Sequence, residues 1–189
     1  MNYVGIDYSM SCPAMSILTD VSDDFVHSKV YYLTNVKSHA GVFFNGNIVG
    51  TYHADYLCEQ ERFDNIAKYF LTNIPKNAKI LIEDYSFGSR AGMLFNIAEN
   101  TGHLKYLLWN NDLKFETIAP SAVKKYASGK GNADKQKMYE AFLSQTKLDL
   151  AKLLSPNRKL GSPVTDIIDS YYIAKYCREH HDRNNNQSV

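Results

Sequence analysis

The sequence predicts an α/β protein with a mixed sheet of five strands and helices on both faces. Five short apolar segments have the length and composition of strands: residues 2–6, 14–18, 29–33, 79–83 and 114–118. The first three follow one another closely, with a polar turn at residues 19–24 between the second and the third, which predicts an antiparallel meander. Segments with helical periodicity separate the later strands, as expected for parallel strands joined by helical crossovers.

The helical segments show apolar residues at a spacing of three to four. Residues 59–71 carry Phe63, Ile66 and Phe70 on one face, and Pro75 follows the end of this helix. We expect further helices over residues 94–109, from Pro120, over 133–144, and from Pro163 to about 179. An Asn-Gly turn signal between apolar pairs predicts a small additional hairpin at residues 43–49.

Length and composition predict one globular domain, which we place at residues 1–181. The chain has 189 residues, 44% of them hydrophobic and 22% charged, enough for one sizeable core. We expect residues 182–189, which include three consecutive asparagines, to be disordered. No apolar stretch reaches the roughly 18 residues of a membrane span, and the first residues lack the pattern of a signal peptide. The three widely spaced cysteines are typical of free thiols, so we expect a cytoplasmic protein.

Four carboxylates in three separated segments are the candidate catalytic residues. Asp7 and Glu83 each end an apolar run, and Asp166 and Asp169 lie three residues apart in the last predicted helix, on one face. An acid at the end of a buried strand is costly unless something compensates its charge. Four hard oxygen ligands suit Mg²⁺ or Mn²⁺ and suit zinc poorly. Two such ions would support hydrolysis of a phosphodiester.

Each acid also has a structural explanation when it is taken alone. Asp7 could cap a turn, Glu83 could pair with a lysine, and Asp166 could cap the last helix. The combination of two strand ends and one helix face favours the metal site. Four histidines are scattered without the spacing of metal ligands, and most are expected to be exposed to solvent: His27, His39, His53 and His103.

The formal net charge of +1 conceals a basic segment. Residues 120–137 carry five lysines against a single aspartate. Lysines beside an acidic metal site suit a nuclease, because they hold the phosphates that flank the cut. A solvated helix surface is the alternative explanation. The segment is not a phosphate-binding P-loop, since Lys124 stands where that motif needs glycine and Gly131 where it needs serine or threonine.

Three segments resemble the catalytic segments of the RuvC-type Holliday junction resolvases: Val4-Gly5-Ile6-Asp7, Leu81-Ile82-Glu83 and Asp166-Ile167-Ile168-Asp169. Residues 97–102, 115–125 and 129–135 are similar, in order and spacing, to the family's helix, its next strand with a basic helix, and its glycine-containing loop. The similarity covers residues 2–177. It is closest to the phage and bacterial branch, which implies the bacterial cytoplasm and either a host or a phage gene.

The resemblance implies an RNase H-like fold, a homodimer, and paired nicking of four-way (Holliday) or other branched DNA junctions. The implied chemistry is two-metal hydrolysis that leaves 5′-phosphate and 3′-hydroxyl ends, with two Mg²⁺ ions per active site and Mn²⁺ as a substitute. The four acids would hold these ions. No membrane is implied, and a branch-migration motor is not identified.

DNA contacts are implied for the basic segment and for the residues after the glutamate. The family's phosphate-contacting lysines correspond to Lys124 and Lys135, and Lys125 and Lys130 are further candidates in the same segment. The family also inserts an aromatic side chain into the junction just after the glutamate. The residues at that place here are Tyr85, Ser86 and Phe87.

The sequence departs from the family pattern at three places. Tyr8-Ser9 follows Asp7 where the family usually has Pro-Gly, Ser170 replaces a common alanine, and the segment 21–56 is longer than the family's second and third strands. Other functions stay open as well: an RNase H-like nuclease acting on RNA–DNA hybrids or flaps, or a junction-binding protein without catalysis. An actin-like ATPase shares Gly-Ile-Asp but needs two domains. The four intact acids argue against the catalytically silent protein.

Overall fold

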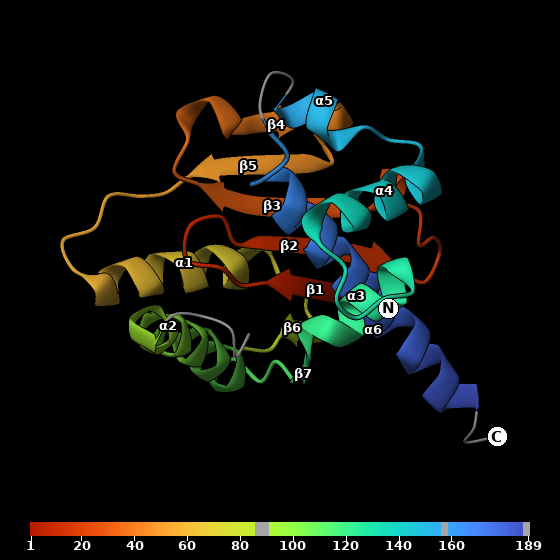
Figure 1. Cartoon of the computed structure of the whole chain (residues 1–189). Coiled ribbons are helices and arrows are strands. Elements are labelled where there is room, and N and C mark those ends of the chain that lie inside the picture. The colour runs from red at the N-terminus through yellow and green to blue at the C-terminus, as the bar shows by residue number, and fades with distance from the viewer. Residues whose placement is uncertain (86–90, 156–158, 187–189) are drawn as a thin grey trace.

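The computed structural model describes residues 1–85, 91–155 and 159–186, and within them seven strands form one sheet (Figure 1). The strands are β1 (Asn2–Asp7), β2 (Ala14–Thr19), β3 (Lys29–Thr34), β4 (Gly41–Phe43), β5 (Ile48–Tyr52), β6 (Ala78–Glu83) and β7 (Phe115–Ile118). Their order is β4-β5-β3-β2-β1-β6-β7. β1, β2 and β3 form the predicted antiparallel meander. On the other side of β1, β6 pairs with β1 in parallel, and β7 pairs with β6 in parallel. The mixed α/β fold is confirmed.

The sheet has two more strands than the five predicted. The predicted hairpin around Asn45 and Gly46 exists, and these residues have φ of 55° and 82°, in the left-handed region that such turns need. Its strands β4 and β5 pair with each other, and β5 also pairs in parallel with β3. The edge of β3 would otherwise present unpaired N–H and C=O groups. The additional length of the segment 21–56 therefore widens the sheet.

The α-helices of the described residues are α1 (Glu59–Asn73), α2 (Ala91–Asn110), α3 (Pro120–Ser128), α4 (Lys135–Thr146), α5 (Leu150–Leu154) and α6 (Val164–Asn186). α1 and α2 cover one face of the sheet. α6 crosses the other face, with α3, α4 and α5 packed against it (Figure 1). The short helix α5 was not predicted. None of the helices in the described ranges is long and apolar enough to cross a bilayer.

The alternation of side chains along the strands divides the core into two layers. Val4 of β1 packs in the layer with α1 and α2, whereas Tyr3 packs in the layer with α6, and Leu81 of β6 also faces α6. Successive residues of a strand point to opposite faces. The same alternation places Asp7 and Glu83, at the ends of these strands, on the α6 side.

Gly5 allows α6 to lie directly on β1. A Cβ atom at this position would stand 2.1 Å from the backbone nitrogen of Ala174 and 2.3 Å from the carbonyl oxygen of Ser170. Ser170 also places its Oγ 2.8 Å from the Oγ of Ser16 in β2, which gives this buried hydroxyl a partner where the family commonly has alanine. This close packing brings the first turns of α6 to the end of β1.

The last helix is longer than predicted. α6 continues to Asn186, beyond the predicted end at about residue 179. Contacts beyond the predicted end at 179 hold it to its neighbours. His180 stacks on Tyr176 with ring centroids 3.9 Å apart, and the ring of His181 lies 5.8 Å from that of Tyr3 in β1. Composition alone could not indicate this packing.

Candidate active site

The four predicted acids come together at one end of the sheet. Asp7 and Glu83 are the last residues of the neighbouring parallel strands β1 and β6, and Asp166 and Asp169 lie in the first two turns of α6. Asp166 is buried and the other three are half-buried. Each acid interacts electrostatically with at least one of the others. The structure thus joins three segments that are far apart in the sequence.

Burial and mutual repulsion disfavour the ionised form of these acids when no cation is bound. Burial raises the pKa of Asp7 well above its ordinary value, and the charge of Asp166 raises it further. Burial likewise raises the pKa of Glu83 to about 7, against the opposing effect of Lys124. The pKa of Asp169 is also raised to about 7 by burial and then by Glu83. The site therefore favours either protons or a positively charged ligand.

Asp166 has the most hydrogen-bond donors of the four. Burial raises its pKa, while a hydrogen bond from Ser162 lowers it, and the Thr165 hydroxyl donates to its Oδ2 at 3.3 Å. Its place in the first turn of α6 also exposes it to the positive end of the helix dipole. These partners are neutral groups, so they orient the carboxylate without neutralising it.

The donor set fits hard divalent cations. Among the described residues, none of the four acids forms an ion pair with a lysine, arginine or histidine. The described residues contain no group of three or more histidine, cysteine, aspartate or glutamate side chains placed to hold one metal ion together. Mg²⁺ is commonly held by one or two carboxylates, with water and substrate phosphates completing its shell. Pairs among these four acids meet that requirement.

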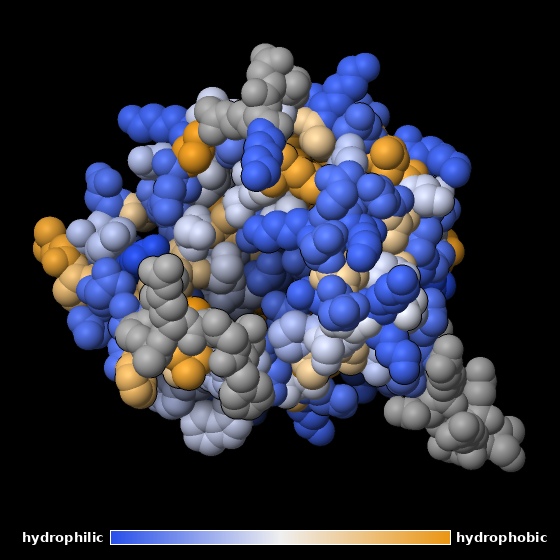
Figure 2. Space-filling view, in the orientation of Figure 1, coloured by the Kyte–Doolittle hydropathy of each residue, from blue (hydrophilic) through white to orange (hydrophobic). Residues whose placement is uncertain are grey.

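Two of the four candidate lysines lie beside the acids. Lys124 in α3 lowers the pKa of Glu83 and of Asp169, and Lys135, the first residue of α4, lowers those of Asp7, Asp166 and Asp169. Lys125 and Lys130 are exposed on the same α3–α4 region, where hydrophilic side chains gather (Figure 2). We call Lys124 and Lys135 the inner lysines because their charges act on the acids, although Lys135 is exposed to solvent, as Lys125 and Lys130 are.

A cavity of about 530 Å³ opens next to Asp7 and Glu83. The loop after Asp7, Arg62 of α1, Tyr85 and the first half of α2 line it. The ring of Tyr85 lies 4.9 Å from the Lys105 ammonium group. Ser86 and Phe87, the other two candidates for the junction wedge, lie outside the described residues.

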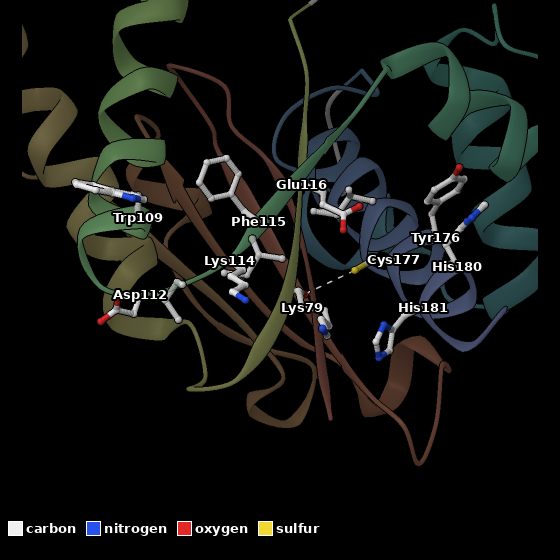
Figure 3. Close-up of a pocket in the computed structure, with 13 residues that line it drawn as sticks. Lys79, Trp109, Asp112, Lys114, Phe115, Glu116, Tyr176, Cys177, His180 and His181 are labelled. Carbon is white, nitrogen blue, oxygen red and sulfur yellow. Dashed lines mark hydrogen bonds between the residues drawn. The ribbon is translucent and has the colours of Figure 1, made fainter. Parts of the chain in front are cut away.

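A second cavity, of about 710 Å³, lies at the opposite end of the sheet, where β6 and β7 begin (Figure 3). Figure 3 shows Phe115 and Glu116 on β7, Lys79 on β6, and Tyr176 and Cys177 on α6 around it. The Cys177 thiol lies 3.7 Å from the carbonyl oxygen of Lys79. Of the predicted catalytic and DNA-binding residues that the structure describes, none borders this cavity.

Comparison with solved structures supports the architecture. Thermus thermophilus RuvC superposes with a TM-score of 0.59, at 16% identity, over 95% of this chain and 97% of that chain. The fold is that of RuvC. A second structure, T. thermophilus RuvC in complex with a Holliday junction substrate, matches with a TM-score of 0.57 and 12% identity, over 92% of this chain and 90% of that chain. No family model and no curated protein matches the sequence.

Sequence reasoning missed the residues that surround the loop after Asp7. Cys12 is buried in this loop, and the charges of Asp166 and Asp7 add to the effect of burial in raising the pKa of its thiol. His53, expected to be exposed, is buried, and so is His39. Arg62 of α1 donates a hydrogen bond to the carbonyl oxygen of Met10. No local pattern signals these contacts, because the residues involved are 42 and 52 positions apart.

Proposed function

We propose that this protein is a structure-selective DNA endonuclease that resolves four-way and other branched DNA junctions by metal-dependent hydrolysis. The observation that carries the proposal is the convergence of Asp7, Glu83, Asp166 and Asp169 at one end of a RuvC-like sheet, with Lys124 and Lys135 beside them. The junction-bound RuvC neighbour supports branched DNA as the substrate class.

The four acids would hold two Mg²⁺ ions, and Mn²⁺ would substitute. When bound, such a pair lowers the pKa of a water molecule and stabilises the charge on the leaving oxygen. Departure of the 3′ oxygen leaves a 5′-phosphate and a 3′-hydroxyl. Each of the four acids interacts electrostatically with the other three, so the cluster as a whole would share its carboxylates between the two ions.

Lys124 and Lys135 would bind the phosphates next to the scissile one. Both ammonium groups act on the acids through space, yet neither forms an ion pair with them among the described residues, so both keep capacity for a phosphate. Lys125 and Lys130 would follow the backbone further out, where contacts are set by charge and not by sequence. Tyr85 borders the cavity beside Asp7 and offers its ring to an unpaired base, an interaction worth roughly 1–3 kcal/mol.

Paired nicks need two active sites related by a twofold axis, so we propose a homodimer. α2 offers a surface for the second copy. Its outer side carries Phe95, Tyr106 and Trp109, which are 70%, 56% and 70% exposed. The rings of Tyr106 and Trp109 lie 6.0 Å apart and form one patch. Exposed aromatic patches of this kind mark protein interfaces.

The dimer is tested by the mass of the protein in solution. We expect Tyr106→Glu with Trp109→Glu to yield a monomer that still nicks single strands but no longer cuts both strands together. Tyr52→Glu, a control at another exposed ring, should leave the mass unchanged. A dimer that survives the double substitution would place the interface elsewhere.

The function is tested with purified protein, Mg²⁺ and three labelled substrates: a four-way junction, a linear duplex and an RNA–DNA hybrid. We expect paired nicks in the junction only, and Asp7→Asn should abolish them while junction binding persists. Cleavage of the hybrid alone would move the protein to the ribonucleases of the same fold. Binding of the junction without any cleavage would identify a protein that recognises junctions and does not cut them.

A further inference from the structure

The loop that follows Asp7 is held by two side chains from distant segments. This loop, residues 8–13, joins β1 to β2 and contains the Tyr8-Ser9 departure from the family pattern. Arg62 Nη2 donates to the carbonyl oxygen of Met10 at 2.9 Å, and His53 Nε2 lies 3.1 Å from the carbonyl oxygen of Ser11. Because a carbonyl oxygen only accepts, the proton of the neutral imidazole is on Nε2.

Both side chains are themselves fixed. The backbone N–H of His53 donates to the carbonyl oxygen of Thr34 in β3 at 3.1 Å, directly after β5 ends. The Arg62 guanidinium lies 5.4 Å from the centroid of the Tyr56 ring and 3.5 Å from a carboxylate oxygen of Glu59. The additional hairpin and the segment after it therefore end beside the loop of the active site.

The loop has internal contacts that limit its other conformations. The backbone N–H of Cys12 donates to the Ser9 hydroxyl at 3.2 Å. Tyr8 is buried with its ring 5.6 Å from that of Phe70 in α1. With these contacts, each residue from Tyr8 to Cys12 has a partner or is buried. The loop lines the same cavity as Asp7 and Glu83, so its conformation determines how Asp7 meets a ligand.

We infer that Arg62 and His53 are positioning residues that set the orientation of Asp7 and thereby the affinity of the site for divalent cations. The inference rests on the proposed function in taking Asp7 as a metal ligand. Groups that orient metal ligands typically change metal affinity or activity by about 10–100-fold when they are removed. The Arg62 guanidinium donates a hydrogen bond to the Met10 carbonyl oxygen while it also contacts the Glu59 carboxylate and the Tyr56 ring. The single ammonium group of a lysine cannot make all three contacts.

The test measures binding of Mn²⁺ to the full chain by calorimetry or by electron paramagnetic resonance, with no DNA present. We expect Arg62→Met and Arg62→Lys to weaken Mn²⁺ binding about tenfold or more, whereas affinity for the junction in EDTA stays within twofold. Lys68→Met is the matched control, because Lys68 lies in the same helix in an exposed ion pair with Asp64 at 2.6 Å. The control should bind Mn²⁺ like the original protein.

A second pair of variants separates positioning from folding. His53→Gln keeps an N–H donor for the Ser11 carbonyl, and His53→Leu removes it while keeping an apolar side chain of similar size. We expect the glutamine variant to retain Mn²⁺ affinity within about threefold and the leucine variant to lose about tenfold, at similar melting temperatures. Equal Mn²⁺ binding by folded Arg62→Met, His53→Leu and the original protein would overturn the inference. Failure of the original protein to cut DNA while it binds Mn²⁺ would instead overturn the proposed function alone.

Discussion

The two ends of the sheet carry cavities of similar size whose charged side chains are arranged differently. Where β1 and β6 end, a cavity of about 530 Å³ is bordered by Asp7 and Glu83. Where β6 and β7 begin, a cavity of about 710 Å³ is bordered by Trp109, Phe115 and Tyr176. The larger cavity combines aromatic side chains with acids and lysines side by side, whereas the smaller one borders half-buried acids whose charges repel one another.

The difference shows that a cluster of acids that repel one another identifies the candidate active site, whereas the volume of a cavity does not. Partly buried carboxylates with raised pKa values are typical of functional sites, and a bound cation would relieve the repulsion between them. α6 connects the two ends, since its first turns carry Asp166 and Asp169 and its second half carries Tyr176 and Cys177. Substitutions at either end can therefore test the comparison within one molecule.

The largest expected effect separates two glutamates on adjacent parallel strands. Glu83→Gln should reduce the cleavage rate of a four-way junction roughly 10³-fold, because it removes one of the four proposed metal ligands. Glu116→Gln, in β7 at the opposite cavity, should leave the rate within twofold. Single-turnover cleavage with saturating protein measures both. Equal loss in the two variants would remove the distinction between the two ends.

The next effect tests whether the contact between β1 and α6 holds the site together. Gly5→Ala forces a Cβ into the backbone of α6 and should lower the free energy of unfolding by about 3 kcal/mol or more. Gly161→Ala is the control, since among the described residues its Cβ would meet only the Lys159 carbonyl oxygen, at 3.8 Å. Urea unfolding followed by circular dichroism measures both. A Gly5→Ala protein of unchanged stability would contradict the close packing.

The metal-free protein should lose stability as the pH rises. The pKa values of Glu83 and Asp169 are about 7 in the folded chain, whereas carboxyl groups of unfolded chains titrate near 4. Between about pH 4 and pH 7 the folded state therefore binds more protons than the unfolded state. The contribution of these protons to the free energy of unfolding is fully present below about pH 4 and is lost as the pH rises through about 7.

We expect the free energy of unfolding in EDTA to fall by on the order of 1–3 kcal/mol from pH 5 to pH 8. Glu83→Gln should reduce this fall, and Glu116→Gln should not. Stability that instead rises over the same range would show that the acids are already neutralised by the protein.

The smallest effect concerns the lysines. Lys124→Ala with Lys135→Ala should weaken junction binding and reduce the slope of log affinity against log salt by about 0.9 for each phosphate that the variant no longer binds. Lys79→Ala with Lys114→Ala, at the opposite cavity, is the control with the same change of charge. Both slopes are obtained from binding titrations between about 50 and 200 mM salt. Over this range the DNA affinity of a protein that binds roughly 6–10 phosphates depends strongly on the salt concentration. Identical slopes in the two double variants would exclude the inner lysines as phosphate ligands.

Most of the architecture is encoded locally. The apolar runs that end in Asp7 and Glu83 predict β1 and β6, Pro120 predicts the start of α3, and Asn45-Gly46 predicts the hairpin. These signals depend on residues a few positions apart, so periodicity and turn chemistry are enough to find them. The pairing of β5 with β3 is different, because any exposed strand edge could have accepted it.

The residue types and their spacing were enough to indicate which side chains can do chemistry: four acids at two strand ends and one helix face, and a run of lysines. The folded chain was needed to show which of the lysines reach the acids, and that Arg62 and His53 hold the loop after Asp7. The physical reason is that burial and electrostatic repulsion depend on the distance between residues in space. That distance is set by the packing of α6 on Gly5 and by the order of the strands, which no local pattern encodes.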